Sequence, residues 1–145
     1  MKRESPYKLT IKKLLPASRE EVFAAWTDPE SLKQWMGPGN TSVPLVQVDL
    51  REGGTFRIDM QSESGYHVHT GEYLEIKPPE KLVFTWISEF TDQSPSRVTL
   101  EFFERGDQTE LVLTHEQLPS EDAVKRHTRG WMERVDLLAD YLKNL

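Results

Sequence analysis

The stretch that decides the fold is Ser120–Leu145, SEDAVKRHTRGWMERVDLLADYLKNL, which predicts one long amphipathic helix. Ser120 is a suitable N-cap, and the two acidic residues after it stand where the helix dipole favours negative charge. A helix of this kind must bury its apolar face against something large. Because the chain before it is mostly strand, we expect that partner to be a sheet. The apolar stripe recurs at the spacing of one helix face and consists of Val124, Trp131, Val135, Leu138 and Leu142.

A glycine lies inside this predicted helix, directly before its central tryptophan. Glycine in a helix interior costs about 1 kcal/mol relative to alanine, because it loses more backbone freedom on folding. We therefore expect a packing reason for Gly130, such as the close approach of a strand.

The chain before this helix is typical of one strand, two short helices and six further strands. Alternating apolar and polar residues predict the first strand at Tyr7–Ile11. Ser18-Arg19-Glu20-Glu21 is a capping box that starts one short helix, and Asp28-Pro29 starts the next. The later strands are expected at Val43–Leu50, Thr55–Gln61, Tyr66–Ile76, Lys81–Ser88, Val98–Phe102 and Leu111–His115.

Short turns between successive strands predict an antiparallel meander. Pro44 indicates an edge strand, and Lys81–Ser88 is apolar on both faces, as a central or doubly covered strand is. We predict an α+β fold in which a seven-stranded, curved antiparallel sheet surrounds the long C-terminal helix, with two short helices after the first strand. At 145 residues, the chain 1–145 is expected to form a single domain.

Composition and charge argue against several classes of function. The net charge of −6 argues against a nucleic-acid partner, because phosphate binding needs clustered positive charge. Without cysteine, disulfides, a thiol nucleophile and thiolate metal ligands are excluded. With no signal peptide and no apolar run of roughly 20 residues, we expect no membrane association and a cytoplasmic location. The one basic cluster is interpreted as a solvated strand face and a loose terminus, and comprises Lys2, Arg3, Lys8, Lys12 and Lys13.

Four ordered motifs extend over nearly the whole chain. They are Phe23–Glu30 with Leu32–Pro38, Asp49–Phe56, Gly71–Trp86, and Gly130-Trp131 with Leu137–Leu142. Together they resemble the activator of heat-shock-protein-90 ATPase homologue family. The resemblance implies membership of the START-related (SRPBCC) superfamily and a helix-grip fold, in which a hydrophobic ligand cavity lies between the sheet and the C-terminal helix.

His67 and His69 are the strongest candidates for chemistry, because residues two apart on a strand share one face. Such a pair can ligate zinc if a third ligand converges, and His115 is the obvious third. The family's strand order, however, separates the two strands by three spacings, roughly 14 Å in a flat sheet. We therefore predict no metal site.

The orientation of the Tyr66–Ile76 strand is left open by its pattern. Val68, Leu74 and Ile76 mark one face as apolar and would place the histidines on the solvent side or at the rim of a cavity. A β-bulge would exchange the two faces.

The candidate acids are Asp59, Glu72, Glu75 and Glu101. Acid catalysis needs a desolvated carboxylate that faces its substrate. Asp59 shares a face with Arg57, and Glu101 shares one with Thr99, so both are interpreted as surface pairs. Glu75 could cap the central hairpin. Since no catalytic triad, phosphate-binding glycine loop or nucleotide fingerprint is present, we predict no catalytic residue and no cofactor.

The predicted ligand site combines apolar side chains with a few polar groups. Tryptophan favours half-wet positions such as a cavity mouth, because its N–H requires a partner. His115 is expected either as a polar group inside the cavity or as a core histidine with a satisfied hydrogen bond. The expected lining residues are Trp26, Trp35, Phe56, Ile58, Phe84, Trp86, Leu100, Leu113, His115 and Trp131.

Three functions are compatible with these observations. The first is binding of a small hydrophobic or aromatic ligand in the cavity without catalysis, by a monomer or weak dimer. The second is an enzyme of the cyclase or hydratase type that uses cavity histidine and tyrosine residues. The third is an interaction module for a chaperone or regulator protein. A shared fold does not choose among them.

Overall fold

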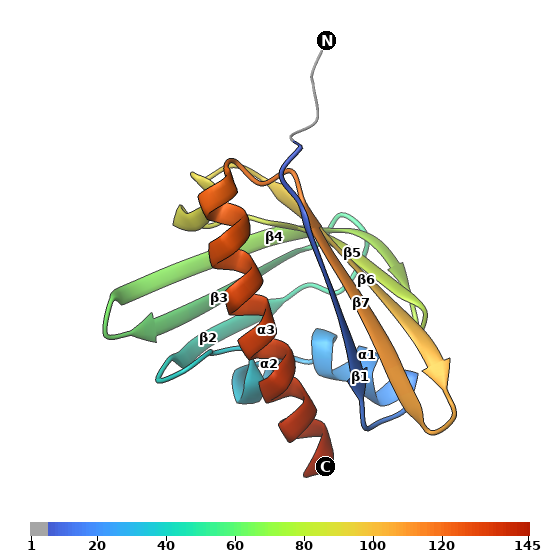
Figure 1. The fold of residues 1–145 in the computed structure, drawn as a ribbon. Coiled ribbons are helices and arrows are strands. Elements are labelled where there is room, and N and C mark those ends of the chain that lie inside the picture. The colour runs from blue at the N-terminus through green and yellow to red at the C-terminus, as the bar shows by residue number, and fades with distance from the viewer. Residues whose placement is uncertain (1–5) are drawn as a thin grey trace.

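The computed structural model describes residues 6–145, so Lys2 and Arg3 of the basic cluster lie outside the described residues. The predicted order of elements is confirmed (Figure 1). The elements are β1 (Leu9–Leu15), α1 (Arg19–Thr27), α2 (Pro29–Trp35), β2 (Ser42–Val48), β3 (Thr55–Ser62), β4 (Gly65–Lys77), β5 (Lys81–Trp86), the 3-10 helix η1 (Glu89–Thr91), β6 (Ser96–Arg105), β7 (Gln108–Glu116) and α3 (Glu121–Lys143).

One antiparallel sheet holds all seven strands in the order β1-β7-β6-β5-β4-β3-β2. The strand with Pro44, β2, is an edge strand, and the doubly apolar β5 is the central strand, as predicted. The long helix α3 crosses the inner face of the curved sheet (Figure 1). Its N-cap is Ser120, whose hydroxyl accepts a hydrogen bond from the Ala123 N–H at 3.1 Å. The fold is therefore the expected helix grip.

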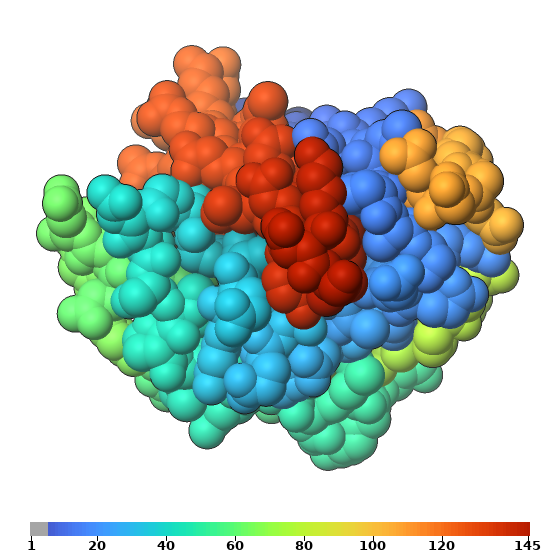
Figure 2. Space-filling view, turned by 90° about the horizontal axis from the view of Figure 1, so that it is seen from below, coloured from blue at the N-terminus to red at the C-terminus, as the bar shows by residue number. Residues whose placement is uncertain are grey.

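The two short helices close one end of the molecule. The predicted caps are present: Ser18 forms a capping box with Glu21, and Asp28 caps α2. In the space-filling view of Figure 2, the red end of α3 lies between the blue first part of the chain and the light-blue residues around α2. The Ser31 and Tyr141 hydroxyls are hydrogen-bonded there at 3.0 Å, so α2 is joined directly to the last turns of α3.

A β-bulge decides which face of β4 is inward. The pairing of β4 with β5 shifts register between Tyr73 and Glu75, so Leu74 is the extra residue. Before the bulge, His69 and Tyr73 are buried and Val68 is exposed. Leu74, at the bulge, is also exposed, and Ile76 after it packs against the core. Val68 and Leu74 thus mark the outer face of β4, and His69 is buried on the inner face and not on the solvent side that their apolar pattern favoured. The β-bulge left open by the sequence is present, at Leu74.

Asp59 is also buried, contrary to its interpretation as half of a surface pair. It does pair with Arg57, whose Nε lies 2.8 Å from Asp59 Oδ1, and the Tyr66 hydroxyl donates to the same carboxylate. The Arg57 hydrogen bond lowers the pKa of Asp59 from its usual value. Arg57 and Tyr66 cover the Asp59 carboxylate on the outer face of the sheet, which is the face opposite α3. Glu75 forms an ion pair with Lys81 across the β4–β5 hairpin, with 3.3 Å between Glu75 Oε2 and Lys81 Nζ.

Candidate functional site

Tryptophan side chains fill the middle of the space between the sheet and α3. Ring centroids lie 4.6 Å apart for Trp26 and Trp35, 6.0 Å for Trp26 and Trp131, and 5.1 Å for Trp86 and Trp131. Beside this stack lies a hollow of only about 20 Å³, room for about one water molecule. Five of the predicted ligand residues line this hollow: Trp26, Phe56, Ile58, Phe84 and Trp86. A ligand cannot occupy this space without displacing side chains.

The other predicted ligand residues form the surrounding core. Trp35, Leu100, Leu113, His115 and Trp131 are all buried. Within residues 6–145, none of these five lines the small hollow or the larger cleft described below.

His115 is a core histidine with both ring nitrogens occupied. The Trp131 Nε1–H donates to Nδ1 at 3.0 Å, so Nε2 carries the proton and donates to Ser96 Oγ at 2.7 Å. The Ser96 hydroxyl in turn donates to the Trp86 carbonyl at 2.6 Å. Burial holds the pKa of His115 well below its usual value. His115 therefore fixes the position of Trp131.

A cleft of about 190 Å³ opens at the other end of the grip, between the first half of α3 and the β3–β4 hairpin. Trp86 forms part of its wall as well as the wall of the small hollow, so the cleft lies directly outside the aromatic core. The lining includes Met60, His67, His69 and Trp86 from the sheet, Phe90 from η1, and Arg126, His127, Gly130 and Arg134 from α3. Sequence reasoning named only Trp86 of these as a ligand residue.

Arg134 is the unusual group in this cleft, because it is a buried cation. Its Nε donates to the Met36 carbonyl at 3.0 Å, and its guanidinium lies over the Trp131 ring at 5.1 Å. In the part of the chain that the structure describes, no carboxylate forms an ion pair with it. Burial lowers the pKa of Arg134 to about 10, so the group remains charged at neutral pH.

Gly130 makes room for this side chain. A Cβ at position 130 would stand 2.8 Å from Nη1 of Arg134, which lies one helical turn further on. The packing reason for the glycine is therefore the guanidinium of Arg134 and not, as predicted, the approach of a strand.

Three histidines complete the polar side of the cleft. Nδ1 of His69 is buried and has no hydrogen-bond partner in the described chain. Burial, followed by the positive charge of Arg134, lowers the pKa of His69 to about 3. Nδ1 of His127 contacts the Ala123 carbonyl at 2.7 Å, and burial lowers the pKa of His127 as well. His67 pairs with Glu89 at the rim. Over residues 6–145, no cluster of three ligating side chains suits a metal ion.

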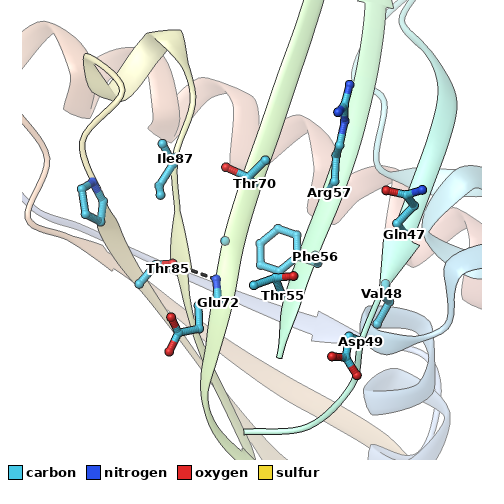
Figure 3. A pocket seen from close by; sticks show the side chains of 12 residues that line it. Gln47, Val48, Asp49, Thr55, Phe56, Arg57, Thr70, Glu72, Thr85 and Ile87 are labelled. Carbon is cyan, nitrogen blue, oxygen red and sulfur yellow. Dashed lines mark hydrogen bonds between the residues drawn. The ribbon is translucent and has the colours of Figure 1, made fainter. Parts of the chain in front are cut away.

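A second hollow, of about 640 Å³, lies on the outer face of the sheet (Figure 3). Figure 3 shows Arg57 on β3, Glu72 on β4 and Asp49 directly after β2, and the three side chains do not converge on one point. Their side chains are exposed, and the Glu72 N–H is satisfied by the Thr85 hydroxyl at 2.8 Å. Since water solvates these charges, a ligand would gain little by pairing with them. The cleft beside α3 is the better candidate site.

A curved antiparallel sheet closed around a C-terminal helix, with a cleft between them, defines a helix-grip protein of the START-related class. The sequence model of the family described as "Activator of Hsp90 ATPase homolog 1-like protein" matches residues 16–143, and the chain belongs to this family. Proteins of this kind commonly bind hydrophobic ligands. None of the helices within residues 6–145 combines the length and apolarity needed to cross a lipid bilayer.

Solved structures agree with this assignment. The AHSA1 protein of Silicibacter pomeroyi is 26% identical, with a TM-score of 0.83 over 94% of this chain and 98% of that one. The protein CalU16 of Micromonospora echinospora is 30% identical, with a TM-score of 0.74 over 93% and 75%. A Chromobacterium violaceum protein at 23% identity has the same fold, with a TM-score of 0.86 over 94% and 98%. No curated protein sequence matches the chain.

Proposed function

We propose that this protein binds a small ligand with an apolar or aromatic body in the cleft between α3 and the β3–β4 hairpin. The observation that supports this most directly is the cleft's apolar wall, where Trp86, Phe90 and Met60 border a hollow that side chains leave unfilled. Pockets for small molecules combine such apolar walls with a few polar groups. At about 190 Å³ the cleft is smaller than the roughly 300–1,000 Å³ typical of drug-sized ligands, so it suits a body of one or two rings.

The lining favours binding over catalysis. Among the described residues, the lining includes three histidines but no carboxylate and no tyrosine. A cyclase or hydratase would need an acid as well as a base. Burial lowers the pKa of His69 and His127, so these two rings are neutral near pH 7 and are poor general acids. The polar groups present can orient a ligand, and we assign them that role.

Removing Phe90 tests the location of the site. Phe90 is half-buried at the cleft, where it contacts the His67 ring at 5.2 Å. Loss of one such apolar contact surface is expected to weaken binding about tenfold or more. Phe103→Ala is the matched control, because Phe103 is 39% exposed and lies on β6 outside the cleft lining. The measurement is isothermal titration of each variant with a neutral bicyclic probe, 2-naphthamide.

The same ligand should raise thermal stability, since it binds only the folded chain. At a hundred times its dissociation constant, the gain is about 2.7 kcal/mol. If the wild-type protein binds neither 2-naphthamide nor 2-naphthoate below millimolar concentration, the proposal fails. Equal loss of affinity in Phe90→Ala and Phe103→Ala would place the ligand elsewhere.

A further inference from the structure

We propose that the ligand is an anion, a small aromatic carboxylate whose carboxyl group pairs with Arg134 at the inner end of the cleft. This inference rests on the proposed function, because it names the polar end of the same ligand. It is carried by a buried guanidinium that lacks an acidic partner and borders an open hollow.

Arg134 is a charged group that is buried without an acidic partner in the described chain. Charged groups are seldom buried unless paired, because removing them from water costs several kcal/mol. Here the only protein acceptors for the guanidinium are the Met36 carbonyl and the weakly accepting Sδ of Met60 at 3.3 Å, within residues 6–145. An anion entering the cleft would supply the missing counter-charge.

Several N–H donors of the Arg134 guanidinium make no hydrogen bond within residues 6–145. Arginine has five N–H donors in a planar fork. Nε is used by the Met36 carbonyl, and one Nη2 hydrogen points to Met60, whereas Nη1 makes no hydrogen bond in the described chain. Three of the five N–H donors, two on Nη1 and one on Nη2, are therefore left for an acceptor with two oxygens, such as a carboxylate. Gly130 leaves Nη1 uncovered, because it contributes no side chain at the point nearest that atom.

The surrounding charges favour an anion as well. The chain as a whole has a net charge of −6, yet the lining of the cleft includes Arg126 and Arg134 and, among the described residues, no acid. Glu89 lies nearby but pairs with His67. The second unpartnered polar group is Nδ1 of His69, buried in the same lining. A neutral imidazole can donate to a carboxylate oxygen without adding a buried charge.

The ligand's aromatic body follows from what lies beside these donors. Trp86 and Phe90 form the apolar wall of the same cleft. A flat aromatic ring could pack against these two side chains while its carboxylate accepts hydrogen bonds from Arg134 on α3. An inorganic anion would leave the apolar wall bare, and a neutral aromatic would leave Arg134 unpaired.

Matched ligands separate this inference from the proposed function. Isothermal titration at pH 7.5 with 2-naphthoate and 2-naphthamide compares bodies of the same shape that differ in charge. Because hydrogen bonds to charged groups are the strong ones, wild-type protein should bind the acid about 10- to 100-fold more tightly than the amide. Arg134→Met should bring this ratio close to one, mainly by weakening the acid.

Arg129→Met is the control variant. It removes the same charge from α3, but Arg129 is exposed on the outer side of the helix and is absent from the cleft lining. The acid-to-amide ratio should stay within about twofold of the wild-type value. Arg134→Lys should give an intermediate ratio, since it keeps the charge and loses the fork.

The outcomes are distinct. Equal binding of acid and amide by the wild-type protein overturns the anion site but leaves the proposed function standing, and this comparison needs no variant to fold. A ratio that survives in Arg134→Met, with a melting temperature that shows a folded protein, also overturns it. Titration with sodium benzoate and with inorganic phosphate distinguishes an aromatic carboxylate from any anion: tighter binding of phosphate would overturn the assigned ligand class.

Discussion

Replacing Trp131 with alanine should lower the free energy of unfolding by about 3–5 kcal/mol, the usual range for truncating a buried tryptophan. Trp131 is fully buried at the centre of α3 and contacts the rings of Trp26 and Trp86. Its N–H also holds His115, so the substitution leaves a buried acceptor without its donor. The measurement is urea unfolding followed by far-ultraviolet circular dichroism.

The neighbouring residue is the matched control. Met132 is 54% exposed on the outer side of α3, so Met132→Ala should change stability by less than about 0.5 kcal/mol. Alanine raises helix propensity at both positions, by at most about 0.7 kcal/mol, so a loss of stability in Trp131→Ala reflects lost burial. A loss below about 1 kcal/mol for Trp131→Ala would show that the aromatic stack does not stabilise the grip.

Lowering the pH from 7 to 5 should destabilise the protein through its buried histidines. The pKa of His69 in the folded state is about 3, below the ordinary value near 6.5 that it regains on unfolding. Above pH 6.5 the ring is neutral in both states and contributes no pH dependence. Below it, the unfolded chain binds a proton that the folded chain does not, so stability falls. For His69 the loss between pH 7 and pH 5 is about 2 kcal/mol.

His115 and His127 act in the same direction, because burial lowers the pKa of both. Asp59 titrates in a different window. Its lowered pKa stabilises the fold above its ordinary value near 3.9, and that contribution disappears only as the pH falls through the folded value. The loss between pH 7 and pH 5 therefore reports the histidines.

Urea unfolding at pH 8, 7, 6 and 5 measures this effect in the wild-type protein and in His69→Gln. Stability should be nearly level from pH 8 to pH 7 and then decline, and the decline should be smaller in the variant. If wild type is as stable at pH 5 as at pH 7, the histidines do not remain neutral in the folded state.

The burial of Arg134 is explained by ligand binding and not by stability of the fold. An unpaired buried guanidinium lowers the stability of the free protein, and exchanging a buried charged group for an apolar one is often neutral or stabilising. Arg134→Met should therefore retain the fold while losing preference for an anion. Such a division between stability and binding is common at functional sites.

Local patterns in the sequence determined the elements and their order. The seven-four-three-four spacing of the apolar stripe predicted α3, Ser18 and Asp28 predicted the caps of α1 and α2, and short turns predicted the antiparallel meander. Each of these depends on residues a few positions apart, so side-chain period and cap chemistry are sufficient. The need to bury the apolar stripe of α3 predicted the sheet around the helix, and the family resemblance implied the same fold.

The tertiary structure alone decided the inward face of β4 and the location of the cleft. The bulge at Leu74 arises from pairing with β5, and it makes a local alternation of apolar residues misleading. The predicted central cavity is filled because Trp26, Trp35 and Trp131, from three helices, meet in one stack. Arg134 becomes a buried cation only because Met36, 98 residues earlier in the chain, supplies its acceptor. Burial and empty volume are sums over contacts between distant segments, and no spacing along the chain records them.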